Sequence, residues 1–293
     1  MATQTLLPAC FAPLAQALAE CFTRPSFVTF QVLLVGWVLC LQRHTVTGIL
    51  RASGALGSKH HSSFHRFFRK AVWSPDAVGQ ALLRLVVKLL APQQRIVLAV
   101  DDTLGRHTGK HIAAASMHHD PLLSTRAKPV FHWGQVWVVL AIVVRVPLWD
   151  KCFALPVMVR LYRAEKTCTR SGRPFQKRTQ LAAQMVAAIA RLLPERRFVV
   201  VGDAACANGS VVKTLPPNVD FLGRARPDAA LFGLPRPKRL GRPPKKGPRL
   251  PSPQARARSV NGWSRLRVVV HGRPVTLKFK CSMPYGTRSA VLV

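Results

Sequence analysis

Two short apolar runs of β-type residues each lead directly into an aspartate, and they constrain the fold more than any other feature of the chain. The first is "RIVLAVDDT" at residues 95–103, and the second is "RRFVVVGDAA" at residues 196–205. Residues 173–193, just before the second run, carry apolar side chains at helical spacing. A strand, a helix and another strand in this order predict two parallel strands joined by a crossover.

Two more strands are predicted between these runs, at residues 132–146 and 152–162, and Pro156 favours an edge strand or a bulge for the latter. The predicted fold class is therefore α/β, a mixed sheet with flanking helices in which the fourth strand returns parallel to the first. We expect Asp101, Asp102 and Asp203 at the carboxyl ends of neighbouring strands, where α/β sheets place ligands.

Residues 1–92 have helical patterning and are predicted to form an all-α domain. Within it, residues 43–70 predict two short helices joined by a turn at Gly54 to Gly57, with Phe64, Phe67 and Phe68 packed inward. This layout is like a helix-turn-helix, whose second helix enters a DNA groove. A basic solvated surface over core phenylalanines explains the same pattern equally well.

Two longer helices complete the predicted N-terminal domain. Residues 27–41 are shorter than the ~20 apolar residues that span a bilayer, so they predict a buried helix. A second helix follows the N-cap Ser74 and Pro75 and ends before Pro92. Its predicted core face carries Val78, Leu82, Leu85 and Leu89.

The predicted catalytic core covers residues 93–218, and residues 219–293 predict a β-rich insertion with a hairpin whose turn holds Gly272 and Pro274. Residues 235–258 have nine basic residues, seven prolines and no acid, so they cannot bury enough apolar surface to fold alone. We interpret them as a mobile basic loop that contacts phosphate or a minor groove; the alternative is an inert surface linker.

The chain has 44 Lys and Arg residues against 11 Asp and Glu, which gives a formal net charge of +33. This excess predicts a polyanionic partner. Nucleic acid is favoured over an anionic membrane, because the basic residues are spread along the whole chain. No secretory signal is recognisable, and seven cysteines without a C-x-x-C pair predict reduced thiols in a cytosolic protein with no zinc site.

The adjacent carboxylates at Asp101 and Asp102 need a positive partner, because two like charges side by side are unfavourable. If Asp203 reaches the same point, the site offers hard oxygen ligands that suit Mg²⁺ or Mn²⁺ in a two-metal arrangement for phosphoryl transfer. Adjacent strand residues point to opposite faces, so we favour Asp102 as the ligand. Asp101 is the alternate metal ligand. Otherwise it caps a helix, pairs with a basic side chain or supports the site from outside the metal's ligand shell. The competing interpretation is that both aspartates are turn or N-cap residues.

At these residues the chain resembles the bacterial insertion-sequence transposases, which have a DDE catalytic core on an RNase H-like fold. The resemblance covers residues 45–293 and is carried by "VDDT", "GKHI", "FQKRTQLAAQMVAAI" leading into "VVVGDAACANG", "FLGRARPDAALF" and "VTLKFKCSMPYG". It implies three acidic residues that hold two Mg²⁺ ions. It also implies an enzyme that nicks double-stranded DNA at the element's terminal repeats and joins the freed end to target DNA. The first acid then matches Asp102, with Asp101 as the alternate, and the second matches Asp203.

The resemblance also implies a glutamate on a late helix, but the last glutamate here is Glu195, before the second motif. We therefore expect a C-terminally truncated or frame-broken product that binds DNA yet cleaves it poorly. The resemblance places it in the cytoplasm on the nucleoid, with no membrane partner, and allows a dimer on DNA. The alternatives are a non-catalytic DNA-binding protein or regulator derived from a transposase, and a nuclease of the same fold.

Twelve basic residues are predicted to contact DNA, from three separate segments. They are Arg66, Arg69, Lys70, Arg173, Lys177, Arg178, Arg236, Lys238, Arg239, Arg242, Lys245 and Lys246. A solvated basic face is the alternative for the segment before the crossover helix. The "SMHHD" stretch at 116–120 is placed on a loop, with a structural or phosphate-contacting role favoured over metal binding.

Overall fold

The computed structural model describes residues 7–92, 95–125, 127–147, 151–203, 209–212, 214–223, 226–233, 235, 244, 246–270, 273–282 and 291–292. The chain forms two compact units. One comprises Met1–Gln93 and Val144–Val159, and the other comprises Gln94–Val143 and Arg160–Val293.

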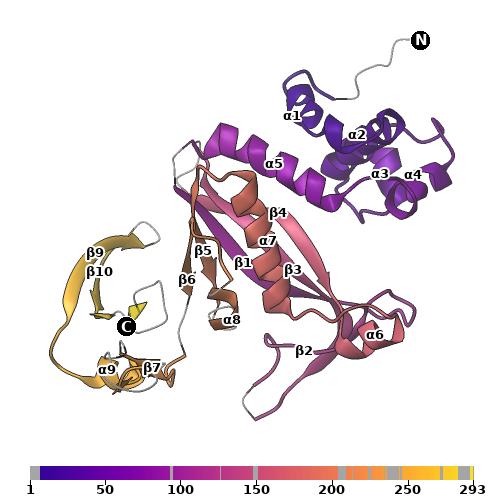
Figure 1. The fold of residues 1–293 in the computed structure, drawn as a ribbon. Coiled ribbons are helices and arrows are strands. Elements are labelled where there is room, and N and C mark those ends of the chain that lie inside the picture. Colours follow the sequence, from indigo (N-terminus) through magenta and orange to yellow (C-terminus); the bar gives the residue numbers. More distant parts are fainter. Residues whose placement is uncertain are drawn as a thin grey trace. The chain divides into compact units, whose positions relative to one another are not determined.

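The first unit is built mainly from helices (Figure 1). They are α1 (Ala12–Gln16), the 3₁₀ helix η1 (Ala19–Cys21), α2 (Arg24–Leu39), α3 (Val46–Ala52), α4 (His61–Arg69) and α5 (Pro75–Leu90). Buried side chains of α2, α3 and α4 form one apolar core, in which Phe64 and Phe67 are 2% and 6% exposed. Gly36 of α2 lies against Ile49 of α3, where a Cβ would collide with the Ile49 carbonyl, so the two helices pack at close range.

The turn between α3 and α4 forms as predicted, with left-handed backbone at Gly54 and Gly57. Phe68, however, is 58% exposed, so the prediction that it packs inward was wrong. It lies one residue beyond the buried Phe67, which turns it about 100° around the helix toward solvent. Trp37 is likewise more than half exposed, because α2 buries only the stripe of Val32, Leu33 and Gly36. None of the described helices is long and apolar enough to cross a membrane.

Helix α5 begins as predicted, with the Ser74 hydroxyl accepting a hydrogen bond from the backbone amide of Ala77 at 3.3 Å. The predicted core face was wrong by one residue, since the buried positions are Gly79, Leu83, Val86 and Val87. The reason is Gly79, where the missing side chain lets the backbone carbonyl of Val157 approach the helix. A small residue, and not the most apolar stripe, sets the contact face.

The second unit contains most of a six-stranded mixed sheet, in the order β2-β3-β1-β5-β6 with β4 also paired to β3. Its strands are β1 (Arg95–Arg106), β2 (Ser116–His119), β3 (Phe131–Arg145), β4 (Cys152–Tyr162), β5 (Arg197–Gly202) and β6 (Val219–Gly223). β1 is antiparallel to β3 and parallel to β5, which is parallel to β6. The mixed sheet with its helices confirms the expected α/β, RNase H-like class, and it extends past residue 218.

Helix α7 (Arg178–Leu192) makes the crossover that precedes β5, as the apolar spacing predicts. Met185 and Ile189 are fully buried, as are Leu98 of β1 and Phe198 of β5. Hydrogen bonds between described residues connect α7 to the sheet region. Arg178 donates to Asp102 at 2.9 Å, and the Asn218 amide donates to the Ala190 carbonyl at 3.4 Å.

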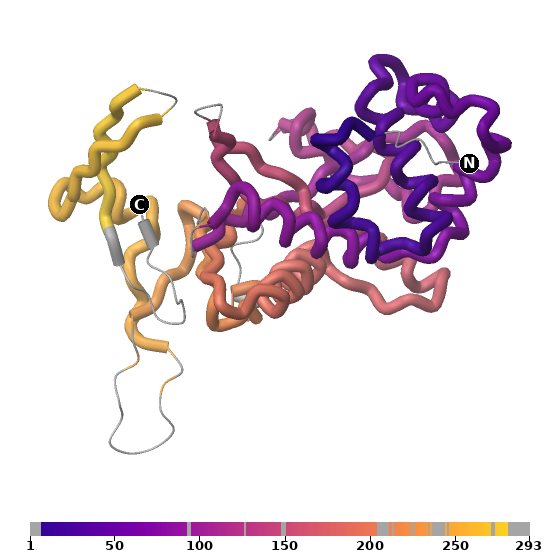
Figure 2. The backbone as a smooth tube through the Cα atoms, turned by 90° about the horizontal axis from the view of Figure 1, so that it is seen from above, coloured from indigo at the N-terminus to yellow at the C-terminus, as the bar shows by residue number. Residues whose placement is uncertain are grey.

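The remaining elements are short. They are α6 (Glu165–Arg170), α8 (Gly209–Val212), β7 (Leu231–Phe232), β8 (Arg249–Leu250), α9 (Pro253–Arg258), β9 (Ser264–Val270), β10 (Arg273–Phe279), β11 (Cys281–Ser282) and β12 (Val291–Leu292). β9 and β10 form the predicted hairpin, coloured toward yellow in Figure 2. Pro274 pairs with Val269 inside the ladder and not in the turn. Parts of the predicted basic loop also form β8 and α9, so those parts are ordered.

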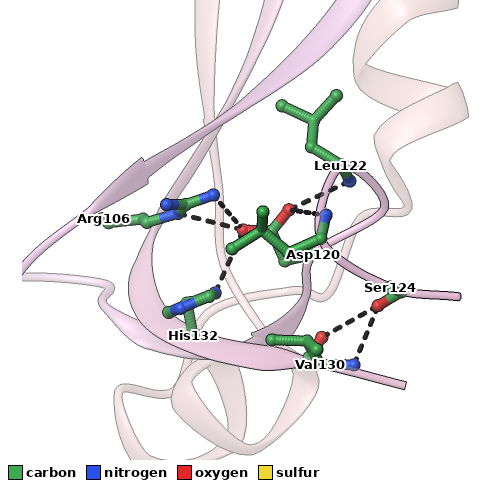
Figure 3. A network of polar contacts seen from close by, with 7 residues as sticks. Arg106, Asp120, Leu122, Ser124, Val130 and His132 are labelled. Atoms are coloured by element: carbon green, nitrogen blue, oxygen red, sulfur yellow. Dashed lines mark hydrogen bonds and ion pairs between the residues drawn. The ribbon is translucent and has the colours of Figure 1, made fainter. Parts of the chain in front are cut away.

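A buried carboxylate ties together the ends of β1, β2 and β3 (Figure 3). Asp120 is 2% exposed, and its Oδ2 lies 2.9 Å from Nε of Arg106 and 3.0 Å from Nδ1 of His132. Its Oδ1 accepts hydrogen bonds from the backbone amides of Leu122 and Leu123 at 3.0 and 3.3 Å. This network holds the end of the strand that carries Asp101 and Asp102, and it gives Asp120 a structural role.

Burial alone would raise the pKa of the Asp120 carboxyl, but the hydrogen bonds from Arg106, Leu122 and Leu123 outweigh it and hold the pKa below its usual value. The charged form therefore stabilises the fold. That contribution is fully present above about pH 3.9, the ordinary pKa in an unfolded chain, and is lost as the pH falls through the lower folded-state pKa.

We expect Asp120→Asn to lower the thermal unfolding midpoint by several degrees at pH 7, because Arg106 loses its charged acceptor. The deficit should shrink as the pH falls below about 4. Asp228→Asn is the matched control, since Asp228 pairs with Arg226 at a side chain that is 66% exposed. Midpoints measured by circular dichroism from pH 7 to pH 3 test this, and equal midpoints for wild type and Asp120→Asn at pH 7 would contradict it.

Candidate active site

The two acid-bearing segments follow neighbouring parallel strands. β1 and β5 pair from Arg95 and Arg197 up to Val100 and Gly202, and the aspartates follow directly after this last pair. Adjacent strands lie about 4.8 Å apart, so the segment that carries Asp101 and Asp102 lies beside the strand that leads into Asp203. Both Asp102 and Asp203 are exposed there.

The sequence predicts Asp101 and Asp102 at the carboxyl end of their strand, and this prediction was wrong. β1 continues to Arg106, because β3 supplies antiparallel partners for every residue from Val97 to Arg106. β5 ends at Gly202, so its described pairing with β1 stops just before Asp101. The two aspartates therefore lie within β1 and not at a strand terminus.

The alternation of side chains along β1 gives the two aspartates different surroundings. Asp102 continues the buried face of Leu98 and Val100, whereas Asp101 continues the opposite face. A register extended by one residue would pair Asp101 with Asp203. Asp101 also accepts a hydrogen bond from the backbone amide of Asp102, with 2.8 Å between the nitrogen and Oδ1.

Arg178 is the positive partner of Asp102. Its Nη1 donates a hydrogen bond to Oδ2 of Asp102 at 2.9 Å, and both side chains are 37% exposed. Arg178 is the first residue of α7, and its guanidinium carbon lies 4.9 Å from the centre of the Tyr162 ring. The sequence had placed Arg178 only among the DNA contacts, and nothing in its spacing pointed to Asp102 or Tyr162.

His118 lies next to this pair, on β2 and not on the predicted loop. Its side chain is buried, its Nε2 lies 2.8 Å from the Ser116 hydroxyl, and its ring lies 5.8 Å from that of Tyr162. Burial lowers the pKa of His118, the charge of Arg178 lowers it further, and the charge of Asp102 opposes this shift. The net shift favours the neutral form of His118. Sequence reasoning assigned His118 no part in this cluster.

The donor chemistry at this edge of the sheet suits a hard divalent cation. Asp101, Asp102 and Asp203 offer carboxylate oxygens, which Mg²⁺ and Mn²⁺ prefer. Within the described ranges, no cluster of three or more His, Cys, Asp or Glu side chains is already gathered around one point. A metal here would thus be held by one or two carboxylates together with water and substrate phosphate, a pattern typical of Mg²⁺.

The other predicted contact residues fall into three groups. Arg66 and Arg69 on α4 are exposed, as is Lys70 just beyond it; Arg173 and Lys177 before α7 are exposed too. Lys246 is exposed, with its Nζ 4.5 Å from the centre of the Phe232 ring. The remaining five lie outside the described residues: Arg236, Lys238, Arg239, Arg242 and Lys245.

Comparison with protein families places these features in a known group. A family model described as DDE superfamily endonuclease matches residues 17–280, which is most of the chain. A comparison with curated proteins gave no match. The matched region includes both acid-bearing strands and the crossover helix between them. The chain therefore belongs to the DDE superfamily of endonucleases.

Proposed function

We propose that this protein is a DDE-type DNA transposase, which nicks DNA at insertion-sequence ends and joins the freed end to a target. The observation that supports the proposal is the parallel pairing of β1 with β5, which runs directly into Asp101 and Asp102 on one strand and into Asp203 on the neighbouring strand. Membership of the endonuclease family and the net charge of +33 support a nucleic-acid substrate.

In this proposal Asp102 and Asp203 hold Mg²⁺ or Mn²⁺, with Asp101 as the alternate first acid. A bound divalent ion would polarise the scissile phosphate and lower the pKa of an attacking water. In nicking, the water oxygen bonds to phosphorus while the bond to the 3′ oxygen breaks, which leaves a 3′-hydroxyl and a 5′-phosphate. In joining, that 3′-hydroxyl attacks a target phosphodiester by the same exchange.

The proposed partners are double-stranded terminal repeats and target DNA, with two copies of the protein on one DNA as the expected assembly. In this proposal the DNA-binding element of the N-terminal unit is formed by α3, the glycine turn and α4. The outward face of α4 carries Arg66 and Arg69. The buried Phe64 and Phe67 fix that face outward. These partners would bring the protein to the cytoplasmic nucleoid.

A non-catalytic DNA-binding protein is the second candidate. The observation that favours it is the ion pair between Asp102 and Arg178, which occupies the first acid in this structure. Such a protein would keep its DNA affinity whatever happened to the acids.

We expect Asp102→Asn and Asp203→Asn each to reduce Mg²⁺- or Mn²⁺-dependent nicking of supercoiled plasmid by more than about 100-fold, since loss of a ligand exceeds the 10- to 100-fold effect of outer partners. Asp220→Asn is the control. It removes the same charge from β6, where Asp220 is 52% exposed and lies 3.5 Å from Arg95. Nicking that survives both substitutions would contradict the assignment, and DNA binding with no nicking by the wild type would favour the second candidate.

We expect the double variant Arg66→Gln with Arg69→Gln to bind duplex DNA more weakly and with a shallower salt dependence. Each lost phosphate contact should reduce the slope of log K against log salt by about 0.9. Arg84→Gln with Lys88→Gln removes the same charge from exposed positions of α5. Fluorescence anisotropy at several salt concentrations gives both slopes, and an equal loss in the two double variants would exclude a specific role for α4.

A further inference from the structure

Arg178 lies where a cation is electrostatically unfavourable. It is the first residue of α7, and Lys177 precedes it at the N-cap. The N-terminal end of a helix carries a partial positive charge, which favours anions. The first turn of α7 contains no acidic residue that would compensate. An arginine at this position therefore needs an anion from elsewhere, and Asp102 supplies it.

The guanidinium is held from two sides. Oδ2 of Asp102 lies 2.9 Å from Nη1, and the Tyr162 ring lies 4.9 Å from the guanidinium carbon. Tyr162 is itself held in place by two neighbouring rings. The centre of its ring lies 5.8 Å from that of His118 and 6.3 Å from that of Phe175. The arginine is thus oriented toward Asp102 by ordered neighbours and does not extend freely into solvent.

The same carboxylate is required for metal. A guanidinium 2.9 Å from one oxygen of Asp102 repels a divalent cation at that carboxylate, and it occupies part of the lone-pair sites that a metal would use. Both side chains are 37% exposed, so the ion pair is weak enough to open without disrupting the core. Opening exposes Asp102 to a metal and Arg178 to another anion.

We propose that Arg178 is an internal counter-ion that competes with the divalent metal for Asp102, and that a DNA phosphate strengthens metal binding by drawing Arg178 away. This inference rests on the proposed function, since it takes Asp102 as a metal ligand. Arg178 is then a positioning residue that couples metal binding to DNA binding. Because such coupling is reciprocal, metal must strengthen DNA binding by the same factor.

The test measures Mn²⁺ affinity of the full chain without DNA, by electron paramagnetic resonance of free Mn²⁺. Arg178→Gln should bind Mn²⁺ about fivefold more tightly than wild type, the factor that a partly exposed ion pair contributes. Arg191→Gln is the matched control, because it removes the same charge from an exposed position of α7 about 20 Å along the helix. Its Mn²⁺ affinity should equal that of the wild type.

A second variant guards against loss of folding in Arg178→Gln. Tyr162→Leu keeps the charge of Arg178 but removes the ring beneath it, so it should also tighten Mn²⁺ binding, by a smaller factor. Adding a short DNA duplex should raise Mn²⁺ affinity in the wild type and raise it less in Arg178→Gln.

Mn²⁺ affinity in Arg178→Gln that is equal to or weaker than that of the wild type would overturn the inference. If Mn²⁺ binding is lost in Asp203→Asn but unchanged in Arg178→Gln, the proposed metal site stands and only the competition between Arg178 and metal is wrong. If no variant binds Mn²⁺, and Asp203→Asn leaves nicking unchanged, the proposed active site fails together with it.

Discussion

The parallel pairing of β1 with β5 is the constraint on which the candidate site depends. The two strands are about one hundred residues apart in sequence, yet they pair in register from Arg95 and Arg197 to Val100 and Gly202. Leu98 and Val200 from this ladder are both buried in the core. A slip of one residue would turn Leu98 and Val100 outward and reverse the faces of Asp101 and Asp102. Burial of these apolar residues therefore determines which aspartate meets Arg178.

Much of this arrangement follows from periodicity in the sequence. The apolar runs before Asp101 and Asp203 predict the strands, and the spacing of Leu181, Met185 and Ile189 predicts the crossover helix between them. Local chemistry also predicts element ends, as the Ser74 cap of α5 shows. These features are encoded within a few residues of where they act, so one sequence is enough to find them.

The features that sequence could not predict depend on distant partners. β1 extends past Asp102 only because β3 is long enough to pair with it as far as Arg106. The core face of α5 is set by the approach of Val157 to Gly79, which the helix pattern alone does not contain. Likewise, the sequence does not distinguish Arg178 from other surface cations. Its role depends on Asp102 of β1 and Tyr162 of β4, which lie beside it in the folded chain. Each depends on contacts between residues far apart in the chain.

In a chain with four times as many basic as acidic residues, an ion pair by itself says little about the role of an acid. Asp102, Asp120, Asp220 and Asp228 each pair with an arginine, and burial separates their roles. Asp120 is almost fully buried and satisfied by several donors, so it cannot exchange its partner without cost to the fold. Asp220 and Asp228 are more than half exposed, where an ion pair contributes little. Asp102 lies between these limits: its side chain is ordered by Arg178 yet exposed enough to change partner, as the proposed exchange of arginine for metal requires.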